Sequence, residues 1–163
     1  FEAKEAGFSL EVPRGWEREL FPERAEFPAF SARFIGSEIG AVLSTPVGAV
    51  LTVGRVPKGI GAVRGGPADV RRYLSTALAP LGEFSALAGS GQGPPPGGKS
   101  MVRDYVLANP LHAPKPFEMR RELAVVETPE AYFVIAYDAT RELFDSHRYA
   151  FERARETLRL AKS

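Results

Sequence analysis

The segment Tyr132–Tyr137, with the sequence YFVIAY, constrains the fold of this chain more than any other stretch. All six side chains are apolar or aromatic, so both faces of an extended strand at this place need cover. The short polar connection Thr128–Glu130 joins it to a preceding β-rich segment at 119–127, which predicts an antiparallel hairpin. We therefore expect 131–138 to be a central strand of a sheet that is covered on each side.

Other strands are predicted by alternating or β-rich segments that end at glycine or proline. Trp16 follows the first of them, after Pro13 and Gly15, and is expected to pack over that corner. Polar or glycine-rich turns and loops are expected at 17–26, 59–66 and 89–98, and a loop or loose hairpin is expected at 36–48. The predicted strands are Phe8–Val12, the second half of Phe27–Phe34, Ala49–Val56, Phe84–Leu87 and Ser100–Ala108.

Two helices are expected. The first begins at Pro67, whose ring is preorganised for the first helical position, and ends at Pro80. The second spans Ser146–Ala161 with Asp145 as its N-cap, and charged residues, including Arg148 and Arg155, cover its outer side. Its apolar stripe consists of Phe144, His147, Phe151, Ala154, Leu158 and Ala161. This order of elements predicts an α+β fold, a central antiparallel β-sheet flanked by helices in an α/β/α sandwich.

Composition limits the class of protein. The 163 residues, of which 44% are hydrophobic and 25% charged, predict a single globular domain over residues 1–163. A net charge of +1 argues against a dedicated nucleic-acid-binding protein. The absence of cysteine excludes disulfides, thiol catalysis and zinc–thiolate sites. No apolar run approaches the roughly 20 residues of a membrane-spanning helix.

The sequence contains no catalytic motif, so we expect no enzymatic activity, no catalytic residues and no dedicated small-molecule substrate. His112 and His147 are the candidate metal ligands. His112 lies in a proline-rich loop, and His147 lies on the apolar stripe, where packing is the favoured interpretation. Asp145 is two residues from His147 and points elsewhere on a helix. Asp104 beside Arg103 is interpreted as an exposed pair on a strand.

Arginines are the candidate partner-binding residues. The doublets Arg71–Arg72 and Arg120–Arg121 each carry two side chains that diverge on a helix or on a strand. A single patch therefore has to be assembled from several elements. The other candidates are Arg141 and Arg148, which flank the start of the last predicted helix.

Five segments, in the same order, resemble the PsbP family of thylakoid-lumen photosystem proteins. They are Gly7–Trp16 (GFSLEVPRGW), Phe27–Phe34, Gly66–Val70, Gly97–Lys99 and Arg141–Phe144 with the helix up to Leu158. The resemblance implies the Mog1/PsbP-like fold, a central antiparallel sheet between helices, which agrees with the architecture expected from periodicity.

The resemblance also implies a function. It predicts a non-catalytic extrinsic subunit or assembly factor of a photosystem, with photosystem II and its oxygen-evolving complex favoured. Such a protein lies in the chloroplast thylakoid lumen, peripheral to the membrane, and binds photosystem core proteins. The family's namesake helps to retain calcium and chloride at a manganese cluster, so calcium and manganese are the implied ions. No ligand set is carried over, because the histidine-bearing motif of the family is replaced here by the proline-rich stretch around His112.

Other departures predict a diverged relative and not the standard oxygen-evolving subunit. The namesake's basic N-terminal extension has no counterpart in the six residues before Gly7. Three alternatives stay open: a PsbP-domain protein that binds a metal or small ligand, an accessory subunit of photosystem I or the NDH complex, and a Mog1-like binder of a small GTPase.

Overall fold

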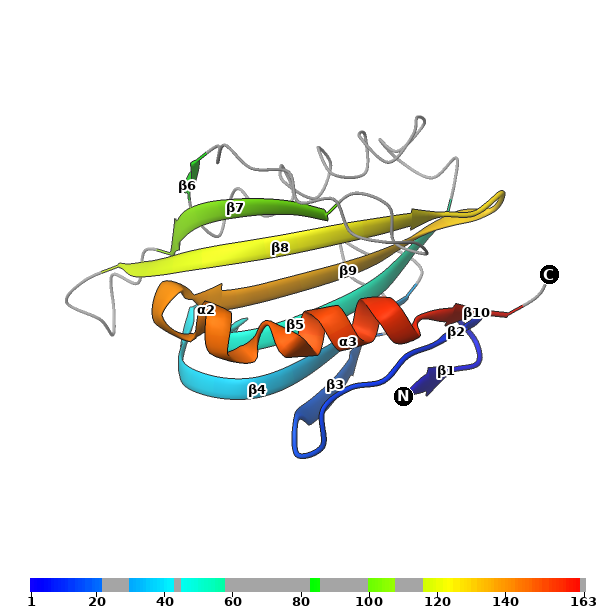
Figure 1. Ribbon diagram of the computed structural model, residues 1–163, viewed down its shortest axis with the longest axis horizontal. Coiled ribbons are helices and arrows are strands. Elements are labelled where there is room, and N and C mark those ends of the chain that lie inside the picture. The colour runs from blue at the N-terminus through cyan, green and yellow to red at the C-terminus, as the bar shows by residue number, and fades with distance from the viewer. Residues whose placement is uncertain (22–29, 43–44, 58–82, 86–99, 108–115, 162–163) are drawn as a thin grey trace.

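The computed structural model describes residues 1–21, 30–42, 45–57, 83–85, 100–107 and 116–161. Within these ranges a seven-stranded sheet runs in the order β3-β4-β5-β9-β8-β7-β6, and all its neighbours are antiparallel (Figure 1). The α+β fold with a central antiparallel sheet is therefore confirmed. Its strands are β3 (Glu17–Phe21), β4 (Phe30–Val42), β5 (Thr45–Pro57), β6 (Glu83–Ser85), β7 (Ser100–Leu107), β8 (Phe117–Glu127) and β9 (Ala131–Thr140).

Strand β9 is the middle strand of the sheet, as its unbroken apolar sequence predicts. All ten of its residues are buried, and Ile135 lies opposite both Val53 on β5 and Ala124 on β8. The predicted hairpin before it is also present. The backbone N–H and the hydroxyl of Thr128 both donate to the carbonyl of Ala131, at 2.9 and 2.8 Å.

Both faces of the sheet carry buried apolar side chains. The larger cluster includes Phe34, Leu51 and Ile135 and extends to Phe144 and Phe151 of the C-terminal helices. The opposite face carries a second cluster, formed by Val56, Leu123, Val125, Tyr132, Val134 and Ala136. The predicted helix from Pro67 and the loops at 59–66 and 89–98 lie outside the described residues.

Two short helices replace the single expected helix. These are α2 (Arg141–His147) and α3 (Tyr149–Thr157), and they lie across one face of the sheet (Figure 1). The predicted N-cap, Asp145, is wrong, because the helix begins directly after β9 with Thr140 at its cap position. The predicted end is also wrong, because the chain becomes extended again at Arg159. No helix in the described part of the chain is long and apolar enough to cross a membrane.

Four residues of the expected apolar stripe are buried, whereas His147 is half-buried and Ala161 is exposed. One residue expected on the outer side is buried as well. Phe144, Phe151, Ala154 and Leu158 are all at most 4% exposed. Arg155 was expected on the outer side, yet it is only 9% exposed, and its guanidinium carbon lies 5.6 Å from the ring centroid of Phe151. A long side chain at the edge of a helix can bury its stem against such a ring.

A second, three-stranded sheet runs in the order β1 (Glu2–Ala3), β2 (Phe8–Ser9) and β10 (Arg159–Leu160). The strand predicted over Phe8–Val12 is thus only two residues long. Beyond it the backbone is satisfied by separate partners: the N–H of Leu10 donates to the carbonyl of Phe1, and that of Glu11 to the hydroxyl of Thr157. Contacts with the terminus and with α3 therefore replace a longer strand ladder.

Two segments expected to be largely irregular contain strands. The expected polar turn after Trp16 begins as β3, whose residues pair with Ser31–Ile35. The segment 36–48, expected as a loop or loose hairpin, belongs to a long β4–β5 hairpin with irregular register between Ile35 and Ser37 and between Glu38 and Gly40. A Cβ at Gly48 would overlap the carbonyl of Ser37. The glycines that suggested a loop therefore permit bulges and close strand approach.

Candidate functional site

The structure brings three of the six predicted arginines to one surface. Arg120 on β8, Arg141 on α2 and Arg148 between α2 and α3 all lie on the helix-covered side of the sheet, each with an acidic partner. We call this region the α2–α3 surface. It comprises these three arginines with Asp104, Glu118, Glu122, Tyr149 and Glu152. Arg71 and Arg72 lie outside the described residues.

Arg121 does not join this surface. It points to the other face of the sheet, where its Nε and Nη2 donate to both carboxylate oxygens of Asp138 at 2.6 Å. The two side chains of the Arg120–Arg121 doublet thus diverge as the alternation of a strand predicts. Since the Arg121 and Asp138 side chains are only 15% and 10% exposed, this pair belongs to the interior of the molecule.

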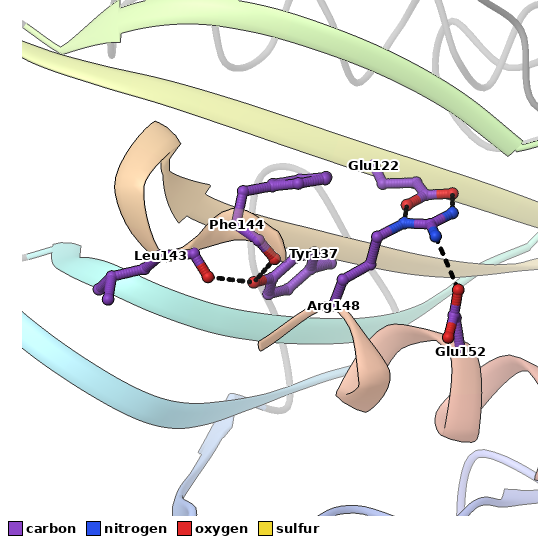
Figure 2. A network of polar contacts seen from close by, with 6 residues as sticks. All are labelled: Glu122, Tyr137, Leu143, Phe144, Arg148 and Glu152. Carbon is purple, nitrogen blue, oxygen red and sulfur yellow. Dashed lines mark hydrogen bonds and ion pairs between the residues drawn. The ribbon is translucent and has the colours of Figure 1, made fainter. Parts of the chain in front are cut away.

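A buried carboxylate anchors Arg148. Glu122, on β8, is 1% exposed, and its two oxygens accept hydrogen bonds from Nε and Nη2 of Arg148 at 2.7 and 3.1 Å (Figure 2). The remaining Nη1 donates to Glu152, one helical turn further, at 2.7 Å. The hydrogen bond to Glu122 raises the pKa of Arg148 above its ordinary value. The guanidinium is therefore held in one orientation by carboxylates on two elements.

A second bidentate pair lies beside the first. Nε and Nη2 of Arg120 donate to the two oxygens of Asp104, on β7, at 2.7 and 3.2 Å. This contact lowers the pKa of Asp104 and raises that of Arg120. The same guanidinium lies 5.4 Å from the ring centroid of Phe144. Asp104 thus pairs across strands, and its side chain is only 20% exposed, not on the open surface as expected. The side chain of its neighbour Arg103 lies outside the described residues.

Tyr137 fixes α2 to the sheet beneath this surface. Its fully buried hydroxyl donates to the carbonyl of Phe144 at 2.8 Å (Figure 2). Burial raises the pKa of Tyr137 well above its ordinary value of 10.0, with a further contribution from the nearby charge of Asp138. The hydroxyl therefore remains a neutral donor.

Three residues of the surface, Tyr149, Arg141 and Glu118, are exposed. The ring of Tyr149 is 51% exposed, and Arg141 forms only an exposed pair with Glu118 at 3.5 Å. Together with the outer part of Arg148 they make a small region rich in the residue types that dominate protein–protein contacts. The α2–α3 surface carries three arginines and four carboxylates, so its net charge is small. It can therefore offer directional hydrogen bonds to a partner, but it does not produce a strong positive field.

The histidines contribute little to this surface. The Nδ1 of His147 lies 2.8 Å from the hydroxyl of Ser146 and 3.3 Å from the carbonyl of Leu143, and its ring lies 6.2 Å from that of Trp16. His112 lies outside the described residues. Among the residues that the structure describes, no group of three or more His, Cys, Asp or Glu side chains could hold a metal ion.

The key residues missed from the sequence are Glu122 and Tyr149. The burial of Glu122 could have been inferred from the sequence, because on a strand it lies on the same face as Arg120 and Ala124. The pairing of Glu152 could have been inferred as well, since it follows Arg148 by four residues on a helix. Nothing local distinguishes Tyr149 from an aromatic residue of the core.

No family model and no curated protein sequence matches the chain. Three solved structures share its fold. The solution structure of cyanobacterial PsbP (CyanoP) from Synechocystis sp. PCC 6803 has a TM-score of 0.57 at 11% identity, over 98% of this chain and 90% of that one. LpqN, involved in cell envelope biogenesis of Mycobacterium tuberculosis, has a TM-score of 0.51 at 18% identity, over 95% and 83%.

The third is a protein of unknown function from Pseudomonas aeruginosa, PA94, described as a putative regulator. It has a TM-score of 0.50 at 16% identity, over 94% of this chain and 92% of that one. All three identities are low, so the likeness concerns the fold. That fold is the PsbP-like one, and it occurs in photosynthetic and non-photosynthetic proteins alike.

Proposed function

We propose that this chain is a non-catalytic accessory protein that docks on another protein through the α2–α3 surface. The observation that carries the proposal is that the exposed Tyr149 directly follows Arg148, whose guanidinium is held by the buried Glu122. Tyrosine and arginine are among the side chains that are enriched at the positions contributing most of the binding energy of an interface. An arginine already held in place loses less conformational entropy on binding.

The proposed partner is a photosystem core protein on the lumenal face of the thylakoid membrane, with photosystem II favoured. This identification is supported by the five PsbP-like segments of the sequence and by the shared fold of CyanoP. The outer pairs of the surface are exposed, so attachment would be weakened by salt. A cell-envelope partner is the second candidate, favoured by the likeness to LpqN.

The test is a sedimentation assay with the labelled full chain and salt-washed thylakoid membranes that contain photosystem II. The double variant Tyr149→Ala/Arg141→Ala removes two exposed side chains of the surface without altering the buried Glu122. We expect it to reduce binding by about tenfold or more, as truncation of central interface residues does. Salt near 1 M, where the Debye length is about 3 Å, should release the wild type.

The chain offers a closely matched control, Ile39→Ala/Arg159→Ala. Ile39 is 53% exposed on β4, and Arg159 is exposed on β10, where it donates to the carbonyls of Glu156 and Leu158, so both resemble the tested residues but lie on other elements. This control should bind like the wild type. If the two double variants bind the membranes equally well, the chain does not dock through the α2–α3 surface. Absence of wild-type binding to these membranes, with binding to bacterial envelope membranes, would overturn the photosystem partner and favour the second candidate.

A further inference from the structure

A cavity of about 500 Å³ lies at the end of the molecule where the two sheets meet. Its lining comes from the turn between β1 and β2, from β5, from the β8–β9 hairpin and from β10. The cavity does not overlap the α2–α3 surface. Small-molecule sites commonly measure about 300–1,000 Å³, so its size suits a compact organic ligand.

The walls are held by hydrogen bonds. Ala161 donates its backbone N–H to the carbonyl of Gly7 at 2.9 Å, which ties β10 to the first turn. Gly7 has a positive φ of 72°, which allows that turn. On the opposite side, Thr128 closes the hairpin through its bonds to Ala131. The cavity is therefore largely formed before any ligand arrives.

The polar anchor is Arg55 on β5. Its side chain is half-buried and lies opposite Phe133 in the sheet register, so both point to the same face. Within the described part of the chain, the Arg55 guanidinium forms no hydrogen bond and no ion pair. Glu5 and Glu130 line the same cavity but do not pair with it there. A half-buried guanidinium with five N–H donors can bind an anion bidentately.

The floor is apolar. Phe133 and Ala131 are 5% and 1% exposed, and Leu160 closes the side. The rim carries Lys4 with Glu5 and Glu130, so a multiply charged anion such as phosphate would meet two nearby carboxylates. We infer that this cavity binds a small amphipathic monocarboxylate, with its carboxylate on Arg55 and its apolar body against Phe133 and Leu160.

The experiment titrates the isotope-labelled full chain with sodium octanoate and follows the amide resonances of Gly7 and Ala161. Octanol tests the apolar body without the charge, and inorganic phosphate tests the charge without the body. We expect saturable shifts at the two cavity amides with octanoate and little change at the remote Gly36. Octanol binding as tightly as octanoate, phosphate binding more tightly than octanoate, or no saturable shift at the cavity would each overturn the inference.

Variants locate the anchor. Arg55→Met keeps much of the side-chain volume and removes the charge, and should weaken octanoate binding about tenfold or more. Arg153→Met is the matched control and should bind like the wild type. If Arg55→Met does not fold, Ala161→Trp, at an exposed position on the cavity wall, should obstruct the site and weaken binding instead. If the variant that folds binds octanoate as tightly as the wild type does, this cavity is not the binding site.

Discussion

The indole ring of Trp16 lies directly against the backbone of Gly36, so closely that a Cβ at position 36 would overlap three ring atoms. Gly36 sits beside the register irregularity of β4, and Trp16 is packed against the edge of the larger core cluster. Because Gly36 has no side chain, the bulged strand leaves room for the indole ring of the only tryptophan to pack against its backbone. This contact joins the N-terminal corner to the seven-stranded sheet.

Substitution of Gly36 by alanine should destabilise the protein by about 1–3 kcal/mol, because the added methyl group displaces the ring. The matched control is Gly40→Ala on the same strand, where a Cβ would meet only Phe117 at 3.7 Å. Chemical denaturation monitored by tryptophan fluorescence measures both the stability and the environment of the ring. Unchanged stability and emission in Gly36→Ala would contradict the contact.

Removal of Arg148 leaves the buried carboxylate of Glu122 without its bidentate partner. We expect Arg148→Ala to cost on the order of 2 kcal/mol in the free energy of unfolding, below the value for a fully buried pair because Arg148 is 39% exposed. Arg153→Ala, which breaks the exposed pair with Glu11, should cost about 1 kcal/mol or less.

The double variant Arg148→Met/Glu122→Leu tests the cause of that loss. Replacing both charges by apolar groups removes the uncompensated carboxylate, so much of the stability should return. Denaturant titration of the wild type, Arg148→Met, Glu122→Leu and the double variant gives four free energies of unfolding. If the loss in the double variant equals the sum of the losses in the two single variants, packing and not the buried charge explains the effect.

The Asp104–Arg120 pair predicts a contribution to stability that depends on pH. Arg120 lowers the folded-state pKa of Asp104 below its ordinary value of 3.8, so the stabilisation is fully present above pH 3.8. As the pH falls below 3.8 the unfolded state takes up the proton first, and the stabilisation is lost as the folded-state pKa is passed. The stability difference between wild type and Asp104→Asn should therefore shrink from pH 7 to pH 2.5. A constant difference in urea titrations would refute this assignment.

The hydroxyl of Tyr137 should contribute on the order of 1–3 kcal/mol, because Tyr137→Phe leaves the carbonyl of Phe144 without its 2.8 Å donor. Tyr149→Phe, which alters an exposed hydroxyl, is the control and should be nearly neutral. Since burial raises the folded-state pKa of Tyr137, its contribution is complete below the ordinary value of 10.0 and declines above it. Ultraviolet titration of the phenolates should give the same absorbance rise for the folded wild type and folded Tyr137→Phe, because Tyr137 stays protonated while the protein is folded.

Local sequence determined the parts of this fold that rest on a single strong pattern. The unbroken apolar run of β9 required cover on both faces and thus a central place, whatever its partners. The stripe of Phe144, Phe151, Ala154 and Leu158 determined which side of the C-terminal helices is buried. In both cases the reason is the removal of apolar surface from water, which depends on the side chains alone.

Only the tertiary structure decided the features that depend on distant partners. The segment 36–48, expected as a loop or loose hairpin, lies in a bulged hairpin in which the Trp16 ring approaches Gly36 and the Ser37 carbonyl approaches Gly48. Strand β3 forms because Ser31–Ile35 lie beside it, and the helix ends at Thr157 because Arg159 and Leu160 pair with β2. The α2–α3 surface likewise exists because Glu122 is buried 26 residues before its partner Arg148 in the chain. Contacts of this kind stabilise the protein only after residues that are distant in the sequence have been brought together by folding.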